Sequence, residues 1–175
     1  MDWPNFYGLT DPPVTINTQS FCSLGGIYRL TPVSRAWITA NAAVFIPFRI
    51  SSPIVLAQLF IYNGATLSGN FDVGIYDAAG TKIVSTGSTD QTTGTINLLR
   101  VVDITDTLIG PGVFYLAAAM DNITGTMMGI LGGGLNSRSM GCVQTATAFP
   151  LPATVTFATN AQIIASIGAT TKTVI

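Results

Sequence analysis

The chain has 175 residues, a formal net charge of −1 and only 9% charged residues, against roughly 25% in a typical globular domain. Its seven basic residues are scattered and no apolar run approaches the ~20 residues of a membrane span, so neither a nucleic acid nor a membrane is an expected partner. With so little charge and a mean hydropathy of +0.51, the chain is expected to bury much of its surface against neighbours.

Residues 1–26 are predicted to form an extended N-terminal arm, because its prolines fix φ and remove backbone donors. Trp3, Phe6 and Tyr7 lie close together in this arm. Rigid rings bury a large area at little entropic cost, so these three residues are predicted to form an interface with another subunit. The alternative, weighted equally, is that the arm folds back over its own domain.

From residue 27 onward the sequence shows one short strand pattern after another, separated by turn signals. Pro47 indicates an edge strand or a bulge, and the segment 162–167 favours strand or coil over a short helix because of its Ile content. The expected strands are 27–30, 36–40, 44–50, 54–63, 71–76, 81–86, 95–104, 113–120, 126–131, 142–149 and 155–157.

The clearest unit in this series is a hairpin over residues 71–86. Phe71, Val73 and Ile75 alternate with smaller or polar residues, which places them on one face of a strand. The turn that follows has Asp77 at its first position and Gly80 at its last, as a type I turn prefers. Residues 113–120 are nearly all apolar and predict a strand that is covered on both faces.

These patterns predict an all-β fold, namely a single antiparallel β-sandwich of jelly-roll type over residues 27–175, preceded by the arm. No internal repeat and no second-domain linker is visible. The start of the chain lacks the basic and apolar segments of a signal peptide, so folding in a cytosol is expected. Cys22 and Cys142 fit no CxxC spacing and are expected to be buried free thiols.

Three short strings, at residues 73–80 (VGIYDAAG), 110–117 (GPGVFYLA) and 120–122 (MDN), resemble a β-sandwich module of structural proteins in tailed bacteriophages. The resemblance covers roughly residues 35–131, and its motifs describe packing and turns, not chemistry. It implies a virion structural protein, either a capsid decoration (cement) protein or a tail protein. The small single domain with an arm favours an attachment, cement or adaptor subunit over a long fibre.

Enzyme chemistry is not expected, because the chain has no His and no Glu and all eight acidic residues are Asp. The pairs Asp72 with Asp77 and Asp103 with Asp106 are predicted to serve turns and not catalysis. No cofactor fingerprint is present. A calcium site at residues 121–122 is conceivable from their oxygen ligands, but a strand cap is preferred, so no metal is expected.

The alternative function is a carbohydrate-binding, host-receptor-binding module of a phage fibre, with a host glycan as partner. Aromatic rings beside Asp and Asn on sandwich loops stack on sugars, and Trp37, Tyr62 and Tyr76, with Tyr115, are the candidate sugar-binding residues. Aromatic residues in strands more often belong to the core.

The favoured prediction is a non-enzymatic virion structural protein that is made in the bacterial host cytoplasm. It would stabilise or decorate the capsid, or join tail parts, through contacts between subunits. Its expected partners are other copies of itself, as a trimer or around another symmetry axis, and other virion proteins.

Overall fold

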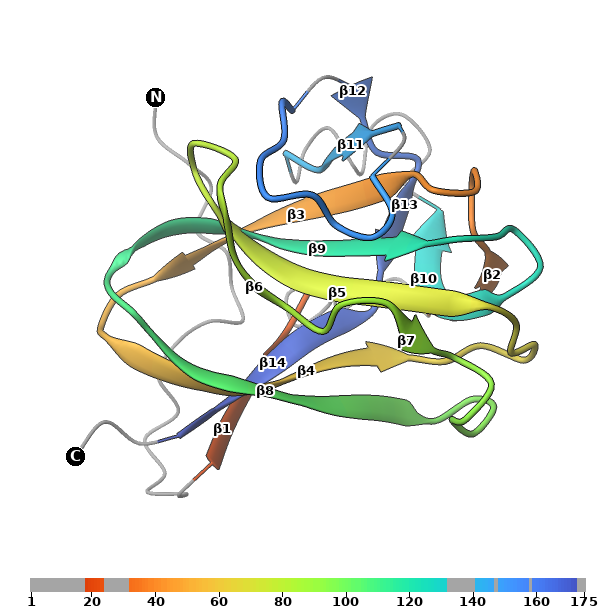
Figure 1. Cartoon of the computed structure of the whole chain (residues 1–175), viewed down its shortest axis with the longest axis horizontal. Helices are drawn as coiled ribbons and strands as arrows, with labels where there is room; N and C mark the ends of the chain where they lie inside the picture. The colour runs from red at the N-terminus through yellow and green to blue at the C-terminus, as the bar shows by residue number, and fades with distance from the viewer. Residues whose placement is uncertain (1–17, 24–31, 132–140, 147, 158, 173–175) are drawn as a thin grey trace.

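The computed structural model describes residues 18–23, 32–131, 141–146, 148–157 and 159–172, and the regular structure of these ranges is entirely β-strand (Figure 1). Within them there is no helix long and apolar enough to cross a membrane. The strands are β1 (Thr18–Cys22), β2 (Val33–Ala36), β3 (Ala43–Ile50), β4 (Ile54–Tyr62), β5 (Asn70–Asp77), β6 (Lys82–Ser85), β7 (Thr89–Asp90), β8 (Leu99–Ile109), β9 (Gly112–Met120), β10 (Thr126–Leu131), β11 (Val143–Thr145), β12 (Thr159–Asn160), β13 (Ile163–Ala165) and β14 (Ile167–Lys172).

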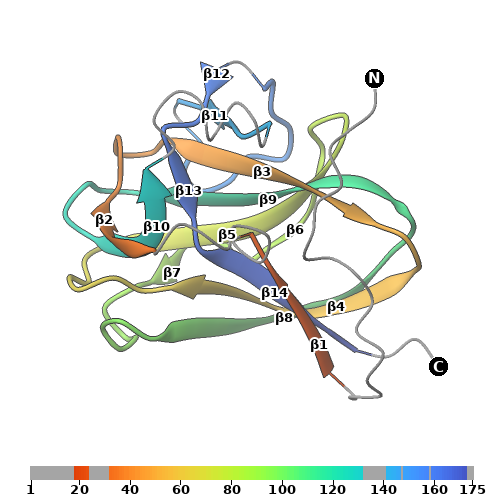
Figure 2. The ribbon, with the colours of Figure 1, turned by 180° about the vertical axis from the view of Figure 1, so that it is seen from behind.

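Two large sheets face each other, and the strand pairings between described residues are antiparallel. One sheet has the order β1-β14-β4-β8, and the other has the order β12-β11-β3-β9-β5-β6 with β7 also paired to β5. A small sheet, β13-β10-β2, lies at one end of the two layers, as the front and rear views show (Figures 1 and 2). The predicted antiparallel β-sandwich is confirmed.

The core between the sheets follows from the period-two patterns of the sequence. Phe71, Val73 and Ile75 of β5 are completely buried, and they face a layer that includes Leu59 and Ile61 of β4. Burying a side chain of this size contributes about 1.5–3 kcal/mol. This shared apolar layer holds the two sheets together, and the predicted hairpin is present as β5, a turn and β6.

The C-terminal part of the chain passes from the small sheet into the four-stranded sheet. Strand β13 pairs with β10, and β14 pairs with β4. The change of partner falls at Ser166, whose N–H donates to the carbonyl of Met128 (2.9 Å) while its own carbonyl accepts from the N–H of Tyr62 (2.9 Å). The preference for strand over helix at residues 162–167 is therefore correct.

Pro47 lies where strand β3 has a partner on one side only. Strand β9 pairs with the whole of β3, whereas β11 pairs only with Ala43–Phe45. Beyond Phe45, β3 is therefore an edge of the sheet, which is a position where strands tolerate proline, and the predicted edge position is confirmed.

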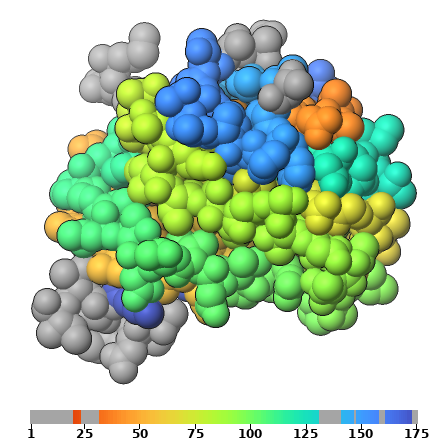
Figure 3. All heavy atoms as spheres, viewed as in Figure 1, coloured from red at the N-terminus to blue at the C-terminus, as the bar shows by residue number. Residues whose placement is uncertain are grey.

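The seven-stranded sheet carries a second apolar layer on its outer face. Residues 148–157, which we call the strap, cross this face and lie in front of it in Figure 3. Phe45 meets the rings of Tyr76 and Phe157 edge-on, with ring centroids 5.3 and 5.2 Å apart. Strand β9 is accordingly covered on both faces from Leu116 to Met120, while Val113 at its start is 38% exposed.

Two predictions fail near the N-terminal end of the described residues. The expected strand at 36–40 is instead a turn, in which Asn41 has a φ of 63° and the indole N–H of Trp37 donates to the carbonyl of Ala42 (2.9 Å). The predicted arm also ends too late, because residues 18–22 form β1 and pair with β14 in the sandwich. Residues 1–17 and the expected strand at 27–30 lie outside the described residues.

Replacing Gly168 by Ala tests how tightly the four-stranded sheet packs. A Cβ at this position would lie 2.0 Å from the carbonyl oxygen of Phe21 and 2.3 Å from the ring of Phe60, so backbone must move. We expect Gly168→Ala to destabilise the protein by at least about 1–3 kcal/mol. Gly110→Ala is the matched control, since a Cβ there meets nothing within 4 Å, and it should change stability by less than about 0.5 kcal/mol. Urea denaturation followed by the fluorescence of buried Trp37 measures both; equal midpoints would contradict the packing.

Candidate functional site

Three connections meet at one end of the sandwich, on the right in Figure 1, and we call this the loop end. They are residues 63–69 between β4 and β5, residues 91–98 between β7 and β8, and residues 121–125 between β9 and β10. The opposite end, which we call the hairpin end, carries the tight turn between β8 and β9. Loops held by a rigid sandwich are where binding residues concentrate.

Two completely buried amide side chains, Asn63 and Gln91, tie the loop-end connections together. Gln91 donates from Nε2 to Oδ1 of Asn63 (3.3 Å) and to the carbonyl of Thr126 (2.8 Å), and its Oε1 accepts from the N–H of Ser68 (3.1 Å). Asn63 donates from Nδ2 to the carbonyl of Thr95 (3.2 Å). Because buried polar groups that lose a partner cost free energy, this network specifies one arrangement of the loops.

Asp121 and Asn122 form a second fastening at the same end. The carboxylate of Asp121 accepts from the backbone N–H and the side-chain amide of Asn70, each at 2.9 Å. Asn122 donates to Asp121 (2.6 Å) and to the carbonyl of Ser68 (2.9 Å). Partial burial acts to raise the pKa of Asp121, but the hydrogen bonds from Asn122 and Asn70 outweigh it and lower the pKa.

These oxygens are therefore occupied by the protein's own donors, as the strand-cap interpretation of residues 121–122 expects. In the ranges that the structure describes, no three His, Cys, Asp or Glu side chains are grouped in a way that could hold a metal ion.

The loop end exposes three large aliphatic side chains on one short segment. Ile96, Leu98 and Leu99 are 52%, 53% and 47% exposed, and we call them the apolar ridge. Burying the remaining half of each side chain would contribute roughly 1 kcal/mol. None of the three belongs to the apolar core, and exposed apolar groups of this kind mark sites where other molecules bind.

The backbone beneath the ridge is held in place. The N–H of Asn63 donates to the carbonyl of Leu98 (3.0 Å), and the N–H of Asn97 donates to the carbonyl of Gly64 (2.9 Å). Asn97 itself has a left-handed φ of 53°, which a strand excludes. The predicted strand at 95–104 is therefore wrong at its start, because β8 begins at Leu99 and continues to Ile109.

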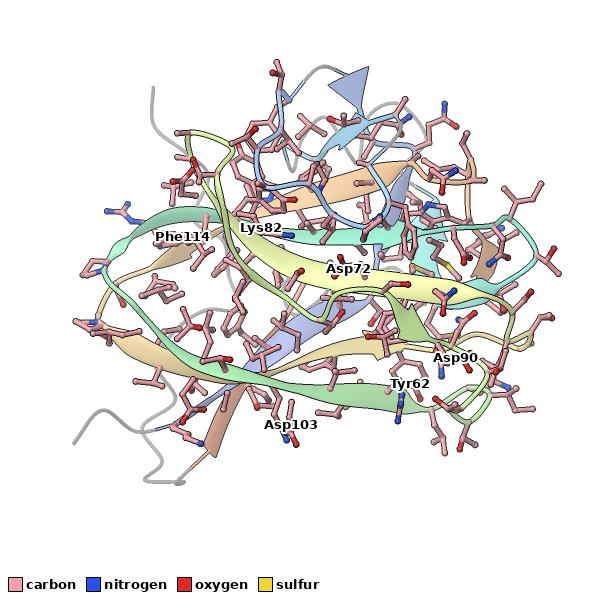
Figure 4. All side chains as sticks on the ribbon, in the orientation of Figure 1. Tyr62, Asp72, Lys82, Asp90, Asp103 and Phe114 are labelled. Atoms are coloured by element: carbon pink, nitrogen blue, oxygen red, sulfur yellow. The ribbon has the colours of Figure 1, made fainter. Side chains whose placement is uncertain are left out.

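Most of the candidate sugar-binding residues lie inside the fold. Trp37 is 2% exposed and Tyr76 is completely buried, with its hydroxyl donating to the carbonyl of Pro152 (2.5 Å). Their ring faces are not accessible, so these two residues are wrong as a sugar platform. Tyr62 is half-buried at the loop end, where Figure 4 shows it near Asp90. Tyr115 is half-buried and stacks on Phe157 beneath the strap (4.3 Å between ring centroids).

The predicted interface residues Trp3, Phe6 and Tyr7 lie outside the described residues. The two cysteines are free thiols, with Cys142 buried and Cys22 half-buried. Burial raises the pKa of the Cys142 thiol to about 12, so it is not a thiolate at neutral pH.

A buried polar group lies under the strap on the outer face of the seven-stranded sheet. Asp72, which has no exposed surface, accepts from the N–H of Leu151 through Oδ2 (2.9 Å) and from the hydroxyl of Thr86 through Oδ1 (3.2 Å). Lys82 donates from Nζ to the carbonyl of Leu151 (2.6 Å). Figure 4 shows Asp72 and Lys82 on this face. Burial raises the pKa of Asp72, although the Leu151 N–H, neighbouring hydroxyls and Lys82 act to lower it.

Of the two aspartate pairs, only Asp77 serves a turn as predicted. The other three aspartates lie within strands β5 and β8 and bond to other parts of the chain. Asp77 accepts through Oδ1 from the N–H groups of Ala79 (2.9 Å) and Thr81 (2.8 Å) in the β5–β6 turn. Asp103 accepts from the side-chain amide of Gln58 (2.6 Å), and Asp106 forms an ion pair with Lys172 (2.7 Å). Among the described residues, the apolar ridge is the densest group of exposed large apolar side chains along the chain.

No family model, curated protein or solved structure matches the chain. The resemblance to phage sandwich modules therefore stays a prediction from the sequence.

The amide network predicts a specific effect of Gln91→Met, which keeps the side-chain length but removes its polar atoms. The N–H of Ser68 and the carbonyl of Thr126 would each lose a partner. We expect a loss of about 1–3 kcal/mol in the free energy of unfolding and faster hydrogen exchange at the Asn97 amide. Gln162→Met, at an exposed position, is the control and should be nearly neutral. Unchanged exchange at Asn97 would show that the network does not hold the ridge.

The pKa of Asp72 predicts how Asp72→Asn changes stability with pH. Because burial raises this pKa above the ordinary value of 3.8, protonation of Asp72 stabilises the fold. That stabilisation is fully present at a pH below the ordinary pKa of the unfolded chain. It is lost as the pH rises through the raised pKa of the folded protein. Asn carries no charge, so the variant should gain stability relative to the wild type as pH rises. Urea denaturation of both proteins between about pH 3 and about pH 7 measures the difference, and a constant difference would contradict the prediction.

Proposed function

We propose that the protein is a non-enzymatic structural protein of a tailed-bacteriophage virion. Its role is to stabilise or decorate the capsid, or to join tail parts, by contacts with other copies of itself and with other virion proteins. Binding through buried surface is the whole of its activity in this proposal. It requires no cofactor.

The observation that carries the proposal is the apolar ridge on its fixed loop. Ile96, Leu98 and Leu99 face outward while the backbone beneath them is bonded to Asn63 and Gly64. A preformed contact surface loses little conformational entropy on binding. A net charge of −1 also means that copies of the chain repel one another weakly.

The virion assignment is supported by the resemblance described above, and the sandwich fold agrees with it. Strands β5 and β9, which carry the strings VGIYDAAG and GPGVFYLA, are neighbours in the seven-stranded sheet. The strings therefore belong to a single packing unit, as expected for a motif that specifies a fold.

Light scattering coupled to gel filtration tests the assembly function. We expect the full chain to elute with a mass that is a multiple of 18.3 kDa and that falls on dilution. A single-chain mass at every concentration would overturn the proposal.

A glycan array tests the alternative function. The assembly function predicts no binding to any glycan, because the rings of Trp37 and Tyr76 are buried. Specific glycan binding that is lost in Tyr62→Ala would instead favour the carbohydrate-binding module.

A further inference from the structure

We infer that the apolar ridge of one copy receives the N-terminal segment Trp3–Tyr7 of another copy. The inference rests on the proposed assembly function and deepens it, because it names the two surfaces that meet. The contact is heterologous, so each copy offers a segment to one neighbour and a ridge to the other. Such contacts produce a ring when the rotation between copies closes and a filament when it does not.

The first observation is where the arm leaves the sandwich. In the antiparallel ladder Thr18 lies opposite Lys172, which in turn lies opposite Val55, and Val55 lies opposite Leu108. This row is at the hairpin end, close to the β8–β9 turn. Strand β1 runs from the hairpin end at Thr18 toward the loop end at Cys22, which is in the row of Gly168, Phe60 and Val101. The backward direction of the strand at Thr18 therefore points away from the ridge of the same copy.

The second observation is that the ridge lies at the other end of the molecule. Strand β8 starts at Leu99, in the ridge, and ends at Ile109, beside the hairpin turn. Its 11 residues span roughly 35 Å at about 3.3 Å per residue. The root of the arm and the ridge of the same copy are therefore separated by most of the length of a sheet.

The length of chain before Thr18 favours a neighbour over the same copy. Tyr7 is 11 residues and Trp3 is 15 residues from Thr18, which gives a maximum reach of about 40 and about 54 Å respectively. To reach its own ridge, the chain would have to reverse direction at Thr18 and cover about 35 Å, which is most of the maximum reach of Tyr7. A neighbour whose loop end faces the hairpin end requires no reversal.

The chemistry of the two surfaces is complementary. The ridge presents aliphatic side chains, and the segment presents the rings of Trp3, Phe6 and Tyr7, a composition typical of binding hot spots. Arg100, next to the ridge, donates from Nη2 to the hydroxyl of Thr93 (3.1 Å), and within the described residues it forms no ion pair. Asp2 adjoins Trp3 and supplies a negative charge for it.

The size of the ridge also suits a short segment better than other occupants. Three half-exposed side chains are far less than the roughly 800 Å² per partner of a standard interface between two folded surfaces, so two ridges cannot form a stable pair by themselves. A single neighbouring Arg does not provide the basic cluster that an anionic membrane surface requires.

The experiment uses three full-length variants. Leu98→Asp disables the ridge, and the triple change Trp3→Ala, Phe6→Ala and Tyr7→Ala disables the segment. Ala153→Asp is the control, because it adds the same charge on the strap, outside both the ridge and the segment. Leu98 is 53% exposed and Ala153 is also exposed, so both Asp variants should keep the wild-type circular dichroism and melting temperature. We expect the first two variants to need at least about tenfold higher concentration for assembly, and the control to match the wild type.

Mixing the two disabled variants identifies the contact. A fluorescently labelled Leu98→Asp copy still has its segment, and an unlabelled triple variant still has its ridge. Titrating the first with the second should raise its anisotropy to that of a two-chain complex of twice 18.3 kDa, whereas titrating it with unlabelled Leu98→Asp should not.

The outcomes separate this inference from the proposed function. If Leu98→Asp or the triple variant assembles as the wild type does, the ridge–segment contact is overturned and the assembly function still stands. A mixture of the two that shows no rise in anisotropy has the same meaning. A wild-type protein that is a single chain at every concentration overturns both. An effect of Ala153→Asp equal to that of Leu98→Asp also overturns the inference, because the effect would then follow from added charge alone.

Discussion

The hydrogen bond between the buried side chains of Asn63 and Gln91 (3.3 Å) is the constraint on which the loop end depends. Sandwich loops are usually the least determined part of such a fold, because they lie outside the apolar layer that orders the strands. Here two amides with no exposed surface extend the ordered interior into the loops. Displacing any one loop would leave buried donors and acceptors without partners, so the loops are held as one unit.

This constraint changes which surface of the molecule is best suited to assembly. The low charge of the chain favours contact through the faces of the sheets, but the structure covers the outer face of the seven-stranded sheet with its own strap. The large apolar side chains that stay exposed include Ile96, Leu98 and Leu99 at the loop end and Leu108 and Val113 near the hairpin end. Contacts at the two ends lead to rings or stacks of copies, and not to sheets packed face against face.

The sequence predicts best where local chemistry alone decides the structure. The β5–β6 hairpin is correct because Asp77 bonds to the N–H groups of its own turn and Gly80 takes the positive φ of 85° that the turn requires. The alternation of β5 likewise assigns its two faces. Neither signal depends on distant parts of the chain.

The prediction fails where distant residues decide. Residues 95–98 have the apolar composition of a strand, but bonds from Asn63 and Gly64, more than thirty positions earlier, hold them as a loop. One local signal does favour a loop at this position. Asn97 has a left-handed φ, and Asn adopts this conformation more readily than most residues. Trp37 and Tyr76 were candidates by residue type, and only the tertiary fold shows that both are in the interior.

The strap has a consequence for how the sequence can vary. The sheet beneath holds the strap by its main chain. Lys82 donates to the carbonyl of Leu151, Tyr76 donates to the carbonyl of Pro152, and Asp72 accepts from the N–H of Leu151. The side chains of Ala153 and Thr154 are exposed to solvent. The path of the strap therefore does not depend on which side chains occupy positions 153 and 154. A position of this kind is free to diversify, or to carry an inserted peptide epitope, without disturbing the layer beneath it.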